Sequence, residues 1–191
     1  MENRNDDEPK LSSKTKRRLY FESNADFHDY KTNKRNILMT TRFNNNTWSE
    51  NEKYRQHNNK IGCIYPTPVV NNAKIAPDTI LFILEMNNDD NKIMGIGMVR
   101  NHIIVKKYRV YSDENYNRYT YIGKTRIDRS DMTEEEETIM KVFDVLCFTG
   151  PRHMKRLQGI RAFPMDMLYK CSKIVDLVDF IAKMFKRRLS N

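Results

Sequence analysis

Two apolar runs separated by five turn-forming residues constrain the fold of this chain more than any other feature of its sequence. Residues 80–86 (Ile-Leu-Phe-Ile-Leu-Glu-Met) and 92–99 (Lys-Ile-Met-Gly-Ile-Gly-Met-Val) both have the composition of β-strands. The residues between them, 87–91 (Asn-Asn-Asp-Asp-Asn), favour a chain reversal. The pattern therefore predicts a β-hairpin over residues 80–99.

The second run of this hairpin carries glycines at alternate positions. Gly95 and Gly97 fall on one face of the predicted strand, because side chains alternate between its two faces. A bare strand face occurs where another segment crosses closely or where a barrel bends. A phosphate-binding loop is a poor fit, because no third glycine, Lys-Ser/Thr pair or helix start follows. We therefore expect another segment to lie close to these glycines.

Further strands and then helices are expected along the rest of the chain. Strand-like runs occur at residues 37–43, 62–65, 103–111 and 119–122. Thr133 to Glu136 form a capping box that predicts a helix start, and Gly150-Pro151 ends that helix. Further helices are predicted from Pro164 through Tyr169 and over residues 173–188. These patterns indicate an α+β fold, with the sheet part at about 36–130 and the helical part at about 131–189.

A chain of 191 residues is expected to form one domain with a tail. Residues 1–34 lack apolar periodicity and predict a flexible polar and basic arm, followed by a single domain over 35–191. Within the arm, residues 14–18 (Lys-Thr-Lys-Arg-Arg) suit a nuclear address or a nucleic-acid contact, but a solvating tail fits their composition better.

The sequence also predicts an intracellular, reducing location. The first eight residues are polar and acidic, and no window approaches eighteen apolar residues, so neither a signal peptide nor a membrane span is expected. The three cysteines, Cys63, Cys147 and Cys171, form no Cys-x-x-Cys pair. An odd number with this spacing favours free thiols over disulfides or a zinc site.

Positive charge is concentrated at the C-terminal end. The formal net charge is +9, and residues 150–191 hold ten Lys/Arg against three Asp/Glu, whereas residues 36–149 hold fifteen of each. This asymmetry suits a polyanionic partner, either nucleic acid or an acidic lipid surface. A solvated helix face accounts for the same charges equally well.

No catalytic signature is found. The histidines His28, His57, His102 and His153 are isolated, and no Ser or Cys lies in a nucleophile motif. Glu134 to Glu137 would radiate around a helix axis and could not converge on one ion. The sequence therefore predicts no enzyme, no cofactor and no metal.

Two stretches carry the residue types that contact nucleic acid. Residues 150–161 form a glycine-bounded basic loop, in which cations suit phosphates and an amide could read a base edge. Residues 108–121 interleave tyrosines with arginines, which suits base stacking beside phosphate contacts. The alternatives are a solvated connector and a half-exposed strand. The predicted contacts are Arg152, His153, Lys155, Arg156, Gln158 and Arg161 in the loop, and Tyr108, Tyr111, Arg118, Tyr119, Lys124 and Arg126 in or after the aromatic stretch.

The first half of the chain resembles the PUA-like barrels, especially their EVE and YTH branches. The resemblance lies in the strand at residues 37–43, the following Trp48, the strand at 77–85 and the glycine-bearing strand at 93–99. It implies a small mixed β-barrel with flanking C-terminal helices. It also implies a pocket for a modified or flipped base at Trp48 and Tyr65, although the further cage tryptophans of those families are lacking here.

A second resemblance covers more of the chain. Residues 85–97, 116–119 and 146–160, together with the Asn- and Lys-rich composition, are similar to an uncharacterised family of nucleocytoplasmic large DNA viruses. This resemblance implies a viral protein in a host cytoplasmic factory or in the virion, with other viral proteins as partners; a nuclear location is also compatible.

These observations together predict a non-catalytic module that binds RNA or DNA. The competing hypothesis is a viral structural or interaction protein, a virion component that docks through its apolar C-terminal helix.

Overall fold

The computed structural model describes residues 12–33, 36–71, 75–104 and 106–190. The chain divides into two compact units, Met1–Lys34 and Arg35–Asn191. In the described residues, no helix has both the length and the apolar character needed to cross a membrane.

The first unit contains helices α1 (Ser13–Glu22) and α2 (Ala25–Thr32). Ser12 caps α1 by accepting from the Thr15 amide, and Asn24 caps α2 by accepting from the Phe27 amide. The Phe21 and Phe27 rings lie 4.9 Å apart. The described part of this segment, which the sequence predicted to be a flexible polar and basic arm, therefore contains two helices.

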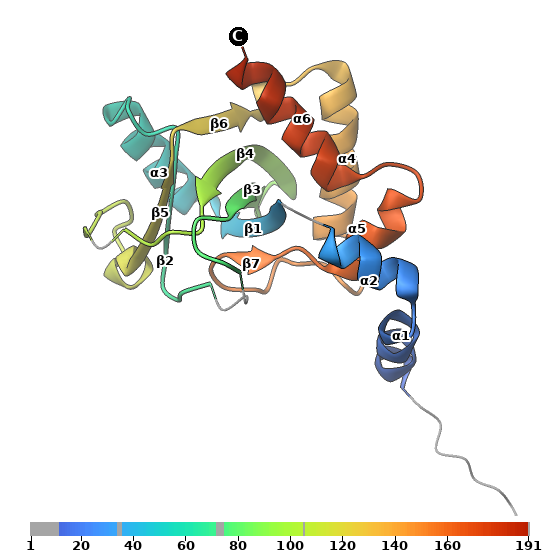
Figure 1. Ribbon diagram of the computed structural model, residues 1–191. Coiled ribbons are helices and arrows are strands. Elements are labelled where there is room, and N and C mark those ends of the chain that lie inside the picture. Colours follow the sequence, from blue (N-terminus) through green and yellow to red (C-terminus); the bar gives the residue numbers. More distant parts are fainter. Residues whose placement is uncertain (1–11, 34–35, 72–74, 105, 191) are drawn as a thin grey trace, which may run out of the picture. The chain divides into compact units, whose positions relative to one another are not determined.

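The second unit is built on a mixed five-stranded sheet (Figure 1). Its strand order is β6-β4-β3-β1-β7, and β1 runs parallel to β3 while the other neighbours are antiparallel. A separate antiparallel pair is formed by β2 and β5. The strands are β1 (Ile37–Phe43), β2 (Cys63–Thr67), β3 (Ile80–Asn87), β4 (Lys92–Arg100), β5 (Tyr119–Gly123), β6 (Thr125–Asp128) and β7 (Arg161–Ala162).

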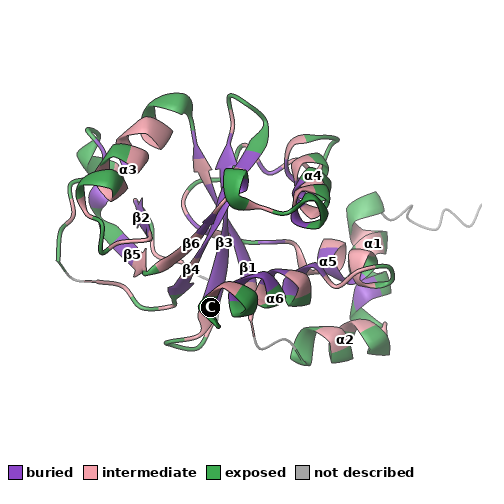
Figure 2. Ribbon diagram, turned by 90° about the horizontal axis from the view of Figure 1, so that it is seen from above, coloured by how far each residue is buried: buried purple, intermediate pink, exposed green. Residues whose placement is uncertain are grey.

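The five-stranded sheet lies between two layers (Figure 2). One layer holds α4 (Glu134–Phe148), α5 (Met165–Ser172) and α6 (Leu177–Leu189), and the other holds α3 (Asn45–His57) with the β2–β5 pair. The central strands are buried from both sides, and the Phe82 and Phe185 rings stack at 5.1 Å between the sheet and α6. Two 3₁₀ turns, Glu114–Asn117 and Arg129–Asp131, complete the unit.

The predicted hairpin and its glycine face are confirmed. Strands β3 and β4 pair as antiparallel neighbours around the turn at residues 88–91. A Cβ atom at Gly97 would overlap the Tyr65 hydroxyl, and one at Gly95 would lie 2.6 Å from a guanidinium nitrogen of Arg126. Side chains from β2 and β6 therefore occupy the space that the two glycines leave.

The α+β class and the three C-terminal helices are confirmed. Helix α4 begins with the predicted capping box between Thr133 and Glu136. Helix α6 begins at Leu177, later than predicted, because Asp176 accepts from the amides of Val178 and Asp179 and so caps it there.

The predicted closed barrel is not found, because the described strands form two separate sheets. The strand predicted over residues 103–111 is also absent from the described residues, apart from one bridge at Ile104. There the Asn117 side chain accepts from the amides of Val110 and Tyr111, in place of a neighbouring strand. Helix α3 was missed because its Asn-rich start resembles a turn, whereas Asn44 forms a capping box with Thr47.

Candidate functional site

A pocket of about 210 Å³ lies at the carboxyl end of β1, and we call it the β1 pocket. Strands β1 and β3 are parallel, so their carboxyl ends meet at one edge of the sheet, where open sheets commonly bind ligands. The β1 pocket is lined by residues 41–44 with Thr47, by Pro66 and Pro68, by Asn88, by Tyr111 and Tyr116, and by Lys155, Leu157, Gln158 and Gly159.

The pocket has a buried floor and an exposed rim. Thr41, Phe43 and Tyr111 are 8%, 2% and 8% exposed, whereas Leu157 is 48% exposed and Gln158 is also exposed. The β1 pocket thus joins residues from both stretches that the sequence singled out, Tyr111 from the aromatic stretch and Lys155 and Gln158 from the basic loop.

Arg42 is a half-buried cation in this pocket that hydrogen-bonds only to neutral acceptors among the described residues. Its Nε donates to the Met154 carbonyl at 2.6 Å, Nη1 to the Gly159 carbonyl at 3.1 Å and Nη2 to Thr40 Oγ1 at 2.8 Å. A guanidinium has five N–H donors, and these bonds use three of them. Arg42 therefore fixes the basic loop, and it also belongs to the lining of the pocket.

The electrostatics of the pocket favour an anion. Burial lowers the pKa of Arg42 to about 10, and the nearby Arg161 cation acts in the same direction. Arg42 is still protonated at neutral pH. Lys155 supplies a second cation, and the described lining contains no Asp or Glu. A bound anion would relieve the cost of burying the Arg42 charge.

The start of α3 also borders the pocket, but a carboxylate already occupies its first amide. The Asn45 N–H donates to Asp89 Oδ2 at 2.8 Å, and the Thr47 N–H donates to Asn44 Oδ1 at 2.8 Å. The attraction for an anion therefore rests on Arg42 and Lys155 and not on the helix N-terminus.

The turn of the β3–β4 hairpin holds the basic loop in place. The Asn88 amide donates to the Phe43 carbonyl, and its side-chain Nδ2 donates to the Lys155 carbonyl at 3.1 Å. Lys155 Nζ in turn donates to Asn91 Oδ1 at 2.8 Å. The loop is therefore fixed at both Arg42 and Asn88.

The other predicted loop residues take different positions. Arg152 forms a two-point ion pair with Asp166, at 2.9 and 3.0 Å, so its charge is matched internally. Arg161 lies close enough to Arg42 to affect its pKa, and its Nε donates to the Gln158 carbonyl. Arg156 is exposed, and His153 Nδ1 is buried with no hydrogen-bond partner among the described residues.

Most of the predicted aromatic-stretch residues lie outside the pocket. The Tyr111 hydroxyl accepts from Asn51 Nδ2 at 3.1 Å, which fixes the ring in the floor. Tyr108 packs partly against the core, Arg118 donates to Asn115, and Tyr119 and Lys124 are exposed on or beside β5. None of these last four lines the β1 pocket.

Arg126 belongs to the interior and is not available to phosphates. Its guanidinium donates to both oxygens of Glu85 and to Asp128 Oδ2, and its side chain is only 7% exposed. The sequence predicted Arg126 as a nucleic-acid contact, because nothing in it indicated that Arg126 pairs with the buried carboxylate of Glu85 on β3.

Trp48 and Tyr65 do not form an open base pocket. Tyr65 is 1% exposed and its hydroxyl donates to Glu85 Oε1 at 2.7 Å. Trp48 packs edge-on against Phe43, and the guanidinium carbons of Arg55 and Arg126 lie 5.6 and 5.5 Å from the centre of its ring. Both aromatic side chains are therefore engaged by neighbours within the fold.

The cysteines lie in or beside the core of the described residues. All three cysteines are free thiols, and burial raises the pKa of both Cys63 and Cys147 to about 12. Within the described ranges, no group of three His, Cys, Asp or Glu side chains is arranged to hold a metal ion.

Sequence reasoning missed Arg42, Asn88 and Tyr116. Arg42 and Asn88 look like a strand residue and a turn residue, and only the tertiary structure brings them to the loop. Tyr116 lies within the aromatic stretch, so its sequence signal was present.

Comparison with protein-family models, with curated proteins and with solved structures gave no match for this chain. The viral and PUA-like resemblances therefore stay predictions.

Proposed function

We propose that this protein is a non-catalytic module that binds single-stranded nucleic acid at the β1 pocket. The observation that carries the proposal is Arg42, a half-buried cation that hydrogen-bonds to neutral acceptors in a pocket whose described lining holds no carboxylate. Guanidinium side chains bind phosphate groups through paired hydrogen bonds, as they do carboxylates.

Other lining residues suit the rest of a nucleotide. The partly exposed Tyr116 ring can stack on a base, because any base offers an aromatic face. The exposed Gln158 side chain can hydrogen-bond to a base edge. A pocket of about 210 Å³ admits part of one nucleotide, whereas nucleotides in a duplex are paired and stacked and must first be extruded. These features favour single strands.

The competing hypothesis is a structural or interaction protein that docks through the apolar face of its C-terminal helix, and most of that face packs against the rest of the fold. Most apolar residues of α6 are buried in the fold, with Ile181 and Met184 0% exposed and Phe185 stacked on Phe82, although Leu189 is exposed. Two arginines at the basic end of α6 are partly engaged, because Arg187 and Arg188 pair with Glu136. We therefore prefer nucleic acid to an apolar protein partner.

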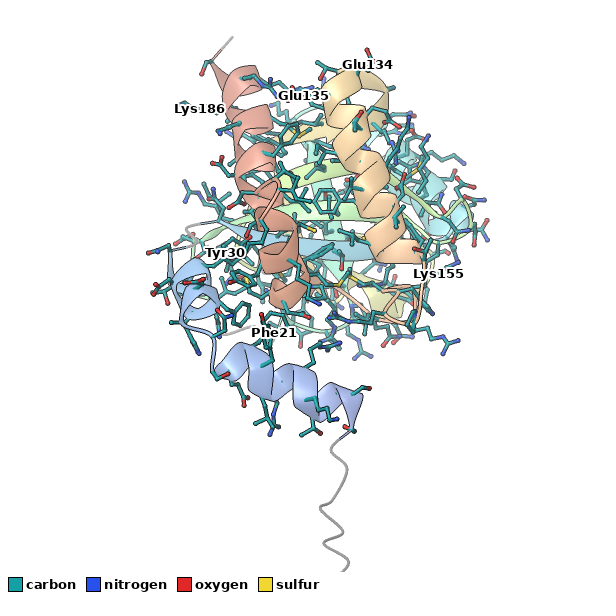
Figure 3. The ribbon with its side chains drawn as sticks, turned by 90° about the vertical axis from the view of Figure 1, so that its right-hand side faces the viewer. Phe21, Tyr30, Glu134, Glu135, Lys155 and Lys186 are labelled. Atoms are coloured by element: carbon teal, nitrogen blue, oxygen red, sulfur yellow. The ribbon has the colours of Figure 1, made fainter. Side chains whose placement is uncertain are left out.

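The test is a binding screen with single- and double-stranded RNA and DNA at several salt concentrations. Lys155→Ala/Arg156→Ala is expected to weaken single-strand binding and to lower the log–log salt slope by about 0.7 per lost phosphate contact. Lys141→Ala/Lys186→Ala is the control, because it removes the same charge from exposed positions on α4 and α6. Lys186, on α6, lies near the start of α4, whereas Lys155 lies near the end of α4 (Figure 3). Equal binding by both variants at every salt concentration would refute the proposal.

A second variant separates stacking from charge. Tyr116→Ala is expected to weaken single-strand binding by roughly 1–3 kcal/mol while leaving the salt slope unchanged. An unchanged affinity would mean that the ring contacts no base.

A further inference from the structure

We propose that the β1 pocket binds the terminal phosphate of a nucleic-acid strand, a phosphomonoester, in preference to an internal phosphodiester. This inference rests on the proposed function and specifies which part of the strand enters the pocket.

The first argument is the charge of the lining. Arg42 and Lys155 both line the β1 pocket, its described lining contains no Asp or Glu, and Leu157 and Gln158 form the exposed rim. Two cations without a carboxylate favour a compact anionic group such as a phosphate over a neutral base.

The second argument is space. An internal phosphodiester carries a nucleoside on each side, so a phosphate bound inside the pocket would need room for parts of both. The cavity of about 210 Å³ is below the range of about 300–1,000 Å³ that is usual for pockets holding whole small molecules. A strand end carries a single nucleoside, which can remain at the rim against Tyr116 and Gln158.

The third argument is charge. A phosphomonoester carries about −1.5 to −2 charges at neutral pH, whereas a diester carries one. The pocket supplies Arg42 and Lys155, and Arg161 lies close to Arg42. Arg42 is also held by three hydrogen bonds, so little further side-chain freedom is lost when a ligand binds.

The experiment compares single strands of one sequence that differ only at their ends: 5′-phosphate, 3′-phosphate, hydroxyl at both ends, and a closed circle without ends. We expect one of the two phosphorylated strands to bind roughly tenfold or more tightly than the hydroxyl-ended strand, as charge-assisted hydrogen bonds warrant. The circle should bind as weakly as the hydroxyl-ended strand. Equal binding of all four strands would overturn the inference and leave the proposed function standing.

Variants connect this preference to the pocket. Arg42→Lys keeps the charge but removes the planar fork, and it is expected to reduce the preference for the phosphorylated end. Because Arg42 also supports the loop, Lys155→Ala serves as a second variant that removes a partly exposed side chain, with Lys186→Ala as its control. If both Arg42→Lys and Lys155→Ala, shown to be folded by circular dichroism, keep the full preference, the end is bound elsewhere and the inference is wrong.

A nucleoside monophosphate and inorganic phosphate complete the experiment as competitors. Competition by the nucleoside monophosphate against the phosphorylated strand supports the inference. If the nucleoside monophosphate binds but no strand does, the phosphomonoester site stands and the proposed nucleic-acid function fails. If neither the nucleoside monophosphate nor any strand binds, both the inference and the proposed function are wrong.

Discussion

Tyr65 donates its hydroxyl to Glu85 Oε1 at 2.7 Å, in the space that Gly97 leaves between the two sheets. Glu85 is fully buried on β3 and also accepts from Arg126 Nε and Nη2, at 2.9 and 2.7 Å for Oε2. Side chains from β2, β3 and β6 thus meet at one buried carboxylate. The polar contact joins the β2–β5 pair to the five-stranded sheet.

The glycine face is expected to tolerate no side chain. Gly97→Val would force Tyr65 away from Glu85, and we expect the free energy of unfolding to fall by roughly 1–3 kcal/mol. Chemical denaturation measures this change. Met98→Val, on the opposite face of the same strand, is the control and should cost less. Wild-type stability of Gly97→Val would show that the two sheets are not held at this distance.

The Glu85–Arg126 pair gives a second stability prediction. Glu85→Gln leaves the Arg126 cation buried with only Asp128 as a charged partner, so we expect a loss of about 3–5 kcal/mol, the cost of breaking a buried ion pair. Glu85→Gln/Arg126→Met removes both charges and should be more stable than Glu85→Gln alone. A double variant less stable than the single one would show that the cation is not the source of the cost.

Glu136 is expected to account for part of the stability that the fold loses at acid pH. It is buried, and its hydrogen bonds with Arg188 hold the pKa of its carboxyl below the usual value. A lowered pKa in the folded state stabilises the fold above the unfolded pKa, near 4.3, and this contribution is lost as the pH falls through the folded value. Between about pH 5 and pH 3, Glu136→Gln should therefore lose less stability than the wild type.

The control for this prediction is Glu134→Gln, an exposed substitution in the same helical turn. Its loss of stability over the same pH range, followed by urea denaturation, should match that of the wild type. If Glu136→Gln loses as much stability as the wild type over this pH range, other carboxylates cause the loss.

The sequence was most informative where one short segment determines the structure. The turn residues between Met86 and Lys92 and the capping box at Thr133 are local signals, and both elements form as predicted. The α3 helix shows the limit of this reasoning, because its Asn-rich start serves equally well as a turn or a helix cap. The barrel prediction failed because strand pairing between distant segments leaves no such local signal.

The candidate site was predictable only in parts. Tyr111 and Lys155 were each singled out, but their meeting in one pocket depends on the tertiary fold. Arg42 carries no signal of its own, because it acts on carbonyls that lie 112 and 117 residues further along the chain. Arg126 shows the reverse case, since a basic residue after an aromatic stretch looks like a surface contact until its buried partner Glu85 is seen.

Trp48 gives the last prediction, because the sequence and the structure assign it different roles. The PUA-like resemblance makes Trp48 a stacking partner for a base, so its loss would weaken binding by roughly 1–3 kcal/mol. In the structure the ring packs on Phe43 and lies beside Arg55 and Arg126, and it does not line the β1 pocket. We therefore expect Trp48→Ala to lower the free energy of unfolding by about 3 kcal/mol, the lower end for removal of a packed aromatic side chain.

The two roles are separated by measuring stability and affinity on the same sample. Chemical denaturation gives the folded fraction of Trp48→Ala, and a titration with a 5′- or 3′-phosphorylated single strand gives its affinity. Once corrected for the folded fraction, the affinity should equal that of the wild type, because Arg42, Lys155 and Tyr116 are unchanged. Tyr116→Ala should still bind more weakly after the same correction, because its ring lines the β1 pocket as well as packing against the core. A loss of affinity in Trp48→Ala without a loss of stability would instead place a base at Trp48, and the binding surface would then extend beyond the β1 pocket.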